Sequence, residues 1–197
     1  RGLRAVRRRD RDQDLQPRPG RGEQQVGAGA VVEVDEHGHH DSAVRGGRAR
    51  ARLRCGAEPG QLFVVRNVAN LVPPYAPDAD HHGTSAALEF AVTGLEIPNI
   101  IILGHAKCGG IAALVDAEPG SAPTNDFLDL WMSVAAPARV AAYERARHEG
   151  GAEDRDHVCR LCEKENVKIG LANLRTFPWI ASREKAGTLK LHGWYFD

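Results

Sequence analysis

A histidine and a cysteine stand three residues apart in the glycine-rich segment Gly104-His105-Ala106-Lys107-Cys108-Gly109-Gly110. Imidazole nitrogen and thiolate sulfur are both good ligands for Zn²⁺, and one tight turn can bring two side chains at this spacing to a single point. Cys108 also precedes a predicted helix, whose N-terminal N–H groups and dipole favour the thiolate over the thiol. The sequence therefore predicts His105 and Cys108 as zinc ligands. Two ligands do not complete a site, so a glycine-rich turn with an incidental His and Cys is the alternative.

This segment directly follows an uninterrupted apolar run at residues 99–103. A strand that is apolar on both faces belongs in the middle of a parallel sheet covered by helices. The hydrophobic spacing predicts further strands at 61–66 and 189–195, and helices at 84–95, from 109, at 136–147 and at 158–176. The sequence therefore predicts an α/β fold, a mostly parallel central sheet with helices on both faces. Ligands of such sheets bind at the carboxyl ends of the strands, where His105 and Cys108 would lie.

The composition of the 197-residue chain changes sharply near Cys55. Residues 1–55 contain 13 Arg, no Lys and 8 acidic residues, a net charge of +5, which leaves −5 for the remainder. The same stretch has no Ile, Phe, Tyr, Trp, Met, Asn or Thr, and its only strand-like run is residues 30–34. Such a segment cannot bury enough apolar surface to offset its chain entropy. We therefore divide the chain into an Arg-rich segment of low order, 1–55, and a globular domain, 56–197.

Three interpretations of residues 1–55 compete. The first is a solvated, disordered tail, and the second is a basic arm for nucleic acid, which the interspersed acidic residues and the absence of aromatic residues disfavour. The third is that the stretch is GC-rich DNA translated out of frame, because the missing residue types are largely those with AT-rich codons. The coding DNA in all three frames would decide between them.

Several segments of the globular part closely resemble the β-class carbonic anhydrases of plants and bacteria. The resemblance covers residues 56–197 and is carried by the segments 58–75, 104–110, 162–167, 171–174, 176–179 and 191–194. Within it, His105, Cys108, Gly109 and Gly110 match the zinc-binding H-x-x-C-G-G turn of that family. The resemblance implies Zn²⁺ as cofactor, reversible hydration of carbon dioxide to bicarbonate, and a homodimer or higher homo-oligomer.

One motif of that family is not matched. The family supplies its first cysteine ligand and an Asp–Arg pair, which gates the fourth metal position, from a C-x-D-x-R motif ahead of the Glu-Pro-Gly turn. The corresponding positions are Val44, Gly46 and Arg48, so only the arginine agrees. The domain as written thus lacks the family's first strand and its third zinc ligand, and the out-of-frame hypothesis would explain this absence as well.

Two substitutes for the missing ligand are conceivable in the sequence. Cys55 is a cysteine nearby, although it lies beside the Glu-Pro-Gly turn rather than at a strand end. Alternatively, His39 takes the place of the cysteine, with Asp41 as the orienting carboxylate and Arg45 as its partner. A polar run of this kind is more typical of a solvated loop, so both assignments stay open.

The leading functional prediction is a zinc-dependent carbonic anhydrase. The alternatives are a catalytically impaired member of that family, or a structural zinc or redox module that uses Cys108, Cys159 and Cys162. Four cysteines are too few for a disulfide scaffold, so we expect a reducing compartment, the cytoplasm. Balanced charge, with 26 Lys+Arg against 26 Asp+Glu, and the lack of a long apolar run indicate neither nucleic acid nor membrane as a partner.

Overall fold

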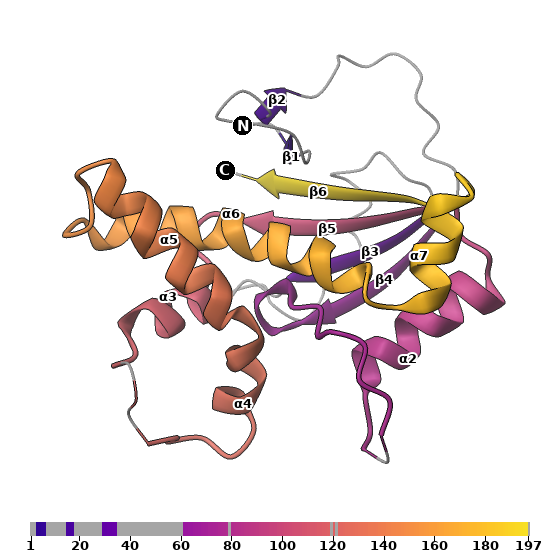
Figure 1. The fold of residues 1–197 in the computed structure, drawn as a ribbon, viewed down its shortest axis with the longest axis horizontal. Helices are drawn as coiled ribbons and strands as arrows, with labels where there is room; N and C mark the ends of the chain where they lie inside the picture. Colours follow the sequence, from indigo (N-terminus) through magenta and orange to yellow (C-terminus); the bar gives the residue numbers. More distant parts are fainter. Residues whose placement is uncertain are drawn as a thin grey trace, which may run out of the picture.

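A six-stranded sheet forms the centre of the molecule in Figure 1. The structure, a computed structural model, describes residues 61–78, 80–118, 120 and 122–196, together with the backbone of 3–6, 15–17 and 29–34. The strands are β1 (Leu3–Val6), β2 (Leu15–Pro17), β3 (Gly29–Val34), β4 (Leu62–Asn67), β5 (Asn99–His105) and β6 (Lys190–Phe196). Their order is β2-β1-β6-β5-β3-β4. The run β6-β5-β3-β4 is parallel, and β1 pairs antiparallel with β6 and β2. The predicted α/β fold with a mostly parallel sheet is therefore confirmed.

Strand β5 is more buried than β4 and β6, the other strands whose side chains the structure describes. Its residues Ile100, Ile101, Ile102 and Leu103 are each at most 1% exposed. It pairs with β3 on one side and β6 on the other, so both of its edges are satisfied by backbone hydrogen bonds. The apolar run thus became the central strand that the sequence predicted, and its carboxyl end delivers His105 to the rim of the sheet.

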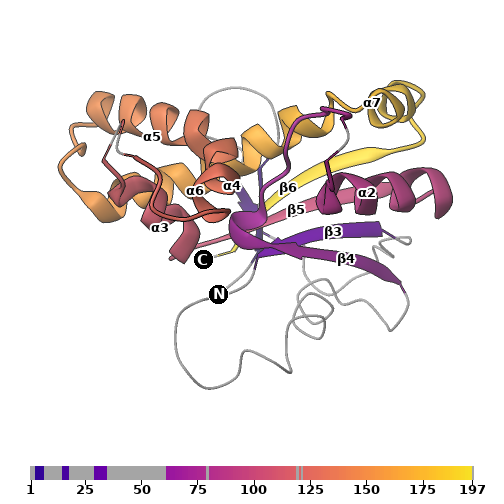
Figure 2. The same ribbon diagram turned by 90° about the horizontal axis from the view of Figure 1, so that it is seen from below.

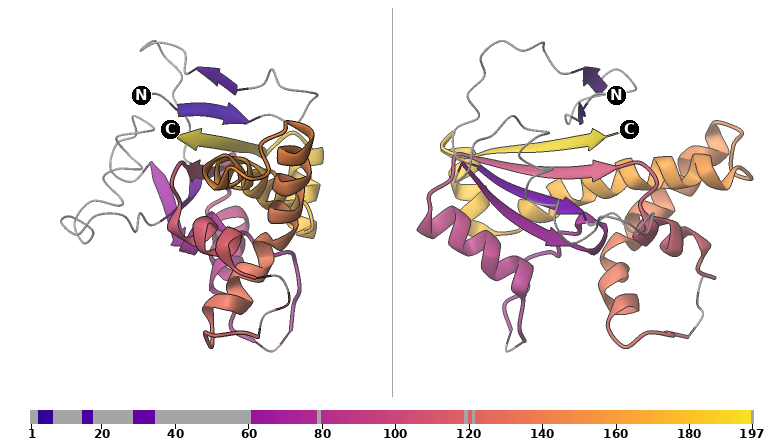
Figure 3. Two further views of the ribbon diagram at one scale, coloured as in Figure 1. Left: turned by 90° about the vertical axis from the view of Figure 1, so that its left-hand side faces the viewer. Right: turned by 180° about the vertical axis from the view of Figure 1, so that it is seen from behind.

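The helices of the described residues pack on one face of the sheet (Figures 2 and 3). Their bounds are α2 (Gly83–Glu89), continued by one π turn (Phe90–Gly94), α3 (Gly109–Asp116), α4 (Leu128–Met132), α5 (Ala136–His148), α6 (Arg155–Leu174) and α7 (Pro178–Lys185). On this face Ile100 and Ile102 join a core with residues of α2, α6 and α7. The opposite face presents Ile101 and Leu103 against Leu62, Trp194 and Phe196, a cluster without any helical residue. The prediction of helices on both faces is therefore wrong for the described part of the chain, because an uninterrupted apolar run indicates that both faces of a strand are buried but not what covers each of them.

Helix α6 is the long helix that packs on strands β5 and β6 of the sheet. It begins after Asp154, whose side chain accepts a hydrogen bond from the backbone N–H of His157, a regular N-cap. Helix α5 packs on it through Ala138, Ala142 and Ala146, which are fully buried, because small side chains allow two helices to approach closely. Within the described residues, no helix combines the length and the hydropathy needed to cross a membrane.

Strand β3 comes from the stretch 1–55 that the sequence places outside the globular domain. It lies between β4 and β5 and is parallel to both. The run at residues 30–34, too short to form a strand alone, is thus stabilised by neighbours on both sides. The sheet accordingly has a strand ahead of β4 in the chain, whereas the boundary at residue 56 stays a prediction.

Candidate metal centre

The segment between β5 and α3 forms a tight turn at the carboxyl end of the central strand. Strand β5 ends at His105, and Cys108 caps the first turn of α3 in an extended conformation. Between them Lys107 adopts a left-handed backbone conformation, with φ of 59°. That conformation costs a residue with a side chain about 1–2 kcal/mol, and it lies where the chain passes from the end of β5 to the start of α3. The turn also bonds to β6, since the N–H of Ala106 donates to the carbonyl of Phe196 at 2.8 Å.

His105 presents a nitrogen with a free electron pair inside the protein. The side chain is nearly buried, at 9% exposure. Its Nδ1 lies 2.7 Å from the carbonyl oxygen of Ala106, an arrangement in which Nδ1 donates, so Nε2 is left as the acceptor. Nε2 is buried and has no hydrogen-bond partner among the described residues. A buried polar atom without a partner is costly, and a metal ion is the partner that an imidazole nitrogen held in this way fits.

Cys108 supplies a buried sulfur at the start of α3. Burial raises the pKa of its thiol, while the backbone N–H groups of Ile111 and Gly110 act in the opposite direction and do not prevail. The N–H groups at the start of α3 thus favour the thiolate, as the sequence predicts, but desolvation of the sulfur is the larger effect. Binding of a divalent cation would reverse this balance, since a coordinating thiol gives up its proton.

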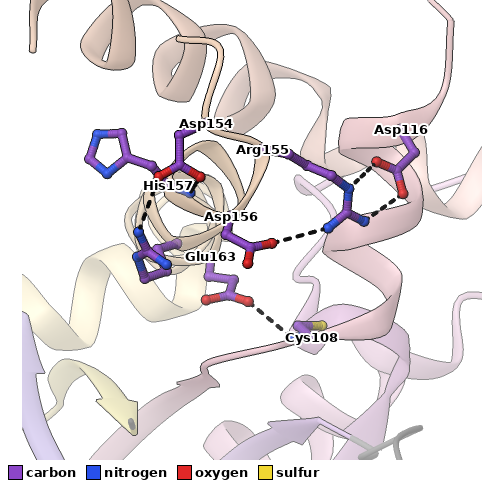
Figure 4. Close-up of polar contacts among 8 residues, drawn as sticks. Cys108, Asp116, Asp154, Arg155, Asp156, His157 and Glu163 are labelled. Carbon is purple, nitrogen blue, oxygen red and sulfur yellow. Dashed lines mark hydrogen bonds and ion pairs between the residues drawn. The ribbon is translucent and has the colours of Figure 1, made fainter. Parts of the chain in front are cut away.

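Glu163 of α6 touches the same turn and was not singled out by the sequence analysis (Figure 4). Its Oε1 accepts a hydrogen bond from the backbone N–H of Cys108 at 2.9 Å, and its Oε2 accepts one from the hydroxyl of Tyr195 at 2.6 Å. The side chain is only 3% exposed, and burial raises the pKa of its carboxyl. The signal available in the sequence was a charged residue on the buried stripe of α6, directly after Cys162 and ahead of Asn166.

A second turn, at Val68–Asn70 after β4, packs against the start of α3. Ala69 and Asn70 have left-handed conformations, with φ of 61° and 47°. Asn166 of α6 donates from Nδ2 to the carbonyl of Ala69 at 2.8 Å. A Cβ at Gly110 would lie 3.1 Å from the Ala69 Cβ, so the absence of a side chain there allows the two turns to meet.

The described residues provide two of the ligands that a zinc site needs. Zn²⁺ in proteins is usually four-coordinate, with at least three protein ligands. Among the described residues, no three His, Cys, Asp or Glu side chains are placed to share one metal ion. His105 and Cys108 fit the ion by donor type and lie in the same turn, at the end of β5 and directly ahead of α3. The other sequence candidates, His39, Asp41, Arg45 and Cys55, lie outside the described residues. A third protein ligand would have to come from there or from a second copy of the chain.

The lack of a group of three metal-binding side chains among the described residues also argues against the structural zinc module. Cys159 and Cys162 lie in α6, as predicted, but together with Cys108 they do not form a metal-binding group. All three are free thiols. Burial raises the pKa of Cys162 to about 12 and raises that of Cys159, so neither is a ready thiolate at neutral pH. The structural zinc module is therefore not supported.

The fold and the turn together define a protein of the carbonic anhydrase type, with a parallel sheet that presents histidine and cysteine at the end of its central strand. The family model for carbonic anhydrase matches residues 46–197, and the chain belongs to this family, in its β class. The match begins inside the stretch 1–55, ten residues ahead of the Gly56 at which the resemblance in the sequence begins.

Curated relatives and solved structures agree with this assignment. The chain is 39% identical over 142 residues to β carbonic anhydrase 6, mitochondrial, of Arabidopsis thaliana, which covers 72% of this chain and 47% of that protein. Among solved structures it is similar to the β-carbonic anhydrase CcaA, with a TM-score of 0.65, 29% identity, and coverage of 87% of this chain and 70% of that one. A tetrameric β-carbonic anhydrase of Sordaria macrospora gives a TM-score of 0.66, 26% identity, and coverage of 88% and 77%. The chain spans about half the length of the curated relatives it matches.

Proposed function

We propose that this chain hydrates carbon dioxide reversibly to bicarbonate and a proton, with Zn²⁺ held by His105 and Cys108. The observation that carries the proposal is the buried, unpartnered Nε2 of His105 beside the sulfur-bearing start of α3. This donor pair lies at the carboxyl end of the central strand, in a chain that belongs to the carbonic anhydrases. Fold, donor chemistry and family thus favour the same reaction.

The residues of the turn have distinct tasks in this proposal. When bound, Zn²⁺ supplies a Lewis acid that makes water a nucleophile near neutral pH, as is general for carbonic anhydrases. The carbonyl of Ala106 fixes the tautomer and orientation of the His105 ring, so that Nε2 is the ligating atom. Cys108 binds as the thiolate, and metal binding therefore releases its proton.

We also propose that the functional form is a homo-oligomer, because a similar solved structure is a tetrameric β-carbonic anhydrase. The described part of the chain exposes large apolar side chains at Phe127 and Leu130, which are 86% and 77% exposed. Exposed apolar side chains in one short segment are typical of surfaces that associate.

A second candidate is a member of the same family that binds zinc weakly and is catalytically impaired. It is favoured by one observation, that the described residues supply only two ligands. The two candidates differ in a measurable quantity, the zinc content of the purified chain.

The deciding experiment measures zinc stoichiometry and carbon dioxide hydration on this polypeptide and on the double variant His105→Ala with Cys108→Ala. The active-enzyme proposal expects about one zinc per chain and hydration activity, both lost in the double variant. Neither metal nor activity in the parent chain would establish the impaired member. Zinc that survives the double variant would overturn the assigned ligands, and the matched control, Cys159→Ser with Cys162→Ser, is expected to retain its zinc.

A further inference from the structure

We propose that Glu163 is a positioning residue of the metal-binding turn: its carboxylate, oriented by the Tyr195 hydroxyl, holds the Lys107–Cys108 backbone in the conformation that brings Cys108 beside His105. The metal-binding part of this inference rests on the proposed function. The anchoring of the turn does not, because it concerns the metal-free chain.

The contacts place Glu163 between three elements. Glu163 lies in α6. The backbone N–H that donates to it belongs to Cys108, the residue directly ahead of α3, and Tyr195 lies in β6. The hydrogen bond to the Cys108 nitrogen has the ordinary length of 2.9 Å, and the one to the Tyr195 oxygen is shorter, at 2.6 Å. Tyr195 is 2% exposed and pairs in register with Gly104 of β5, directly ahead of His105. The carboxylate is therefore fixed from the helix and from the strand, and its orientation leaves little freedom to the turn.

The strained residue of the turn lies directly ahead of the group that Glu163 binds. Lys107 is exposed and left-handed, with φ of 59°. The next backbone N–H, that of Cys108, donates to the Glu163 carboxylate at 2.9 Å. A left-handed residue turns the following N–H groups toward one side of the chain, where an anion can accept from them. Glu163 thus stabilises a backbone conformation that would otherwise be disfavoured.

A packing role alone does not explain a carboxylate here. Taking a carboxylate out of water is costly, and an apolar side chain of similar volume would fill the same space without that cost. What an apolar side chain cannot do is accept hydrogen bonds from the turn. Replacement by leucine is therefore expected to separate the two roles, because it preserves most of the packed volume and removes the anchor.

The test compares Glu163→Leu, Glu163→Gln and Tyr195→Phe, with Glu165→Leu as the matched control. Glu165 lies on the same helix, and its 2.7 Å partner is Lys168 rather than the turn. Glutamine keeps one acceptor oxygen for the Cys108 N–H, and phenylalanine removes only the hydroxyl, so both should act more mildly than leucine. The first measurement is backbone amide exchange at Cys108 in the metal-free chain, and the second is zinc affinity, determined by competition with a chromophoric chelator.

Exchange of the Cys108 amide should be at least about tenfold faster in Glu163→Leu than in the parent, because hydrogen bonds to charged acceptors are the stronger ones. Zinc affinity should fall about 10- to 100-fold, the usual effect of removing a group that orients a ligand. Glu163→Gln should show a smaller increase in amide exchange and a smaller loss of zinc affinity than Glu163→Leu. Glu165→Leu should change neither quantity.

Unchanged amide exchange at Cys108 in Glu163→Leu would overturn the positioning role, whatever happens to zinc. Should Glu163→Leu fail to fold, the same comparison is made with Glu163→Gln and Tyr195→Phe, and parental exchange in both would overturn it. If the parent chain binds no zinc but Glu163→Leu still speeds amide exchange in the turn, the proposed function is refuted and the anchoring role of Glu163 is supported. The two failures are thus distinguishable.

Discussion

The two turns at the carboxyl ends of β4 and β5 are built in the same way and differ in what they carry. Both contain left-handed residues with side chains, Ala69 and Asn70 in one and Lys107 in the other. Both are held by buried side chains of α6 one helical turn apart, Asn166 and Glu163. The anchors have opposite polarity: the amide of Asn166 donates to a carbonyl, whereas the carboxylate of Glu163 accepts from an N–H.

The comparison shows that backbone strain by itself does not mark the chemical site. The turn after β4 has two strained residues but only apolar and amide side chains, Val68, Ala69 and Asn70. The turn after β5 has one strained residue, and it carries the imidazole and the thiol. One helix can therefore support a purely structural turn and a turn that carries the proposed metal ligands, and the side chains on each turn make the difference.

The largest effect on stability is expected from the anchor of the structural turn. Asn166→Leu removes the donor from the buried carbonyl of Ala69 and from the Asn70 side chain, whose Oδ1 lies 3.4 Å from Nδ2. Leaving these two acceptors unpaired should lower the free energy of unfolding by about 3 kcal/mol. The measurement is the midpoint of urea unfolding, with an unchanged slope as the check on two-state behaviour.

We expect Asn166→Leu to lower the stability of the fold without changing metal binding. Zinc content of the folded Asn166→Leu chain should equal that of the parent, and Lys168→Leu on the exposed side of α6 should be within about 0.5 kcal/mol of neutral. If Asn166→Leu released zinc as readily as Glu163→Leu, the two turns would be one coupled unit and the comparison would be broken.

A somewhat smaller loss is expected at the residue ahead of His105. A Cβ at Gly104 would lie 2.7 Å from Cγ2 of Val167 in α6, closer than real Cβ contacts. Gly104→Ala should therefore destabilise the fold by about 2 kcal/mol through overpacking. The matching test is a double-mutant cycle with Val167→Ala, in which the clashing methyl group is absent. A double variant that is as unstable as the sum of the single variants would show that the close approach is not the cause.

The strained residues themselves should respond differently to glycine. Lys107→Gly relieves a left-handed conformation at an exposed position, and the gain, reduced by the greater entropy of the unfolded chain, should be about 0.5 kcal/mol. Ala69→Gly relieves the same kind of strain but removes a methyl group that is 1% exposed and packed in the core. We therefore expect Lys107→Gly to raise the melting temperature and Ala69→Gly to leave it unchanged or lower it. An equal rise in both would mean that the Ala69 methyl group contributes nothing to packing.

The parts of the molecule that sequence could predict are those set by neighbouring residues. The apolar run at 99–103 predicted β5, and His105 and Cys108 follow from their place behind it. Glu163 and Asn166 were not predicted as anchors, because their partners lie 55 and 97 residues away along the chain. Contacts at such separations depend on how α6 lies across the sheet, and no local pattern encodes that.

The smallest effect is expected at the N-cap of α6, the helix that carries both anchors. The pKa of Asp154 is lowered from its ordinary value of 3.8, chiefly because the backbone N–H of His157 donates to its carboxylate. Since the pKa in the folded chain is lower than in the unfolded chain, Asp154 stabilises the fold above about pH 4, and this contribution is lost as pH falls through the folded-state value. Asp154→Asn also caps a helix but does not titrate in this range. Between pH 7 and pH 3 the melting temperature of the metal-free parent should therefore fall slightly more than that of Asp154→Asn. The cap supports α6 as a whole. Amide exchange at Asn70 and at Cys108 should therefore change together in Asp154→Asn or not at all. A change confined to Cys108 would show that the two turns do not share α6 as a common support.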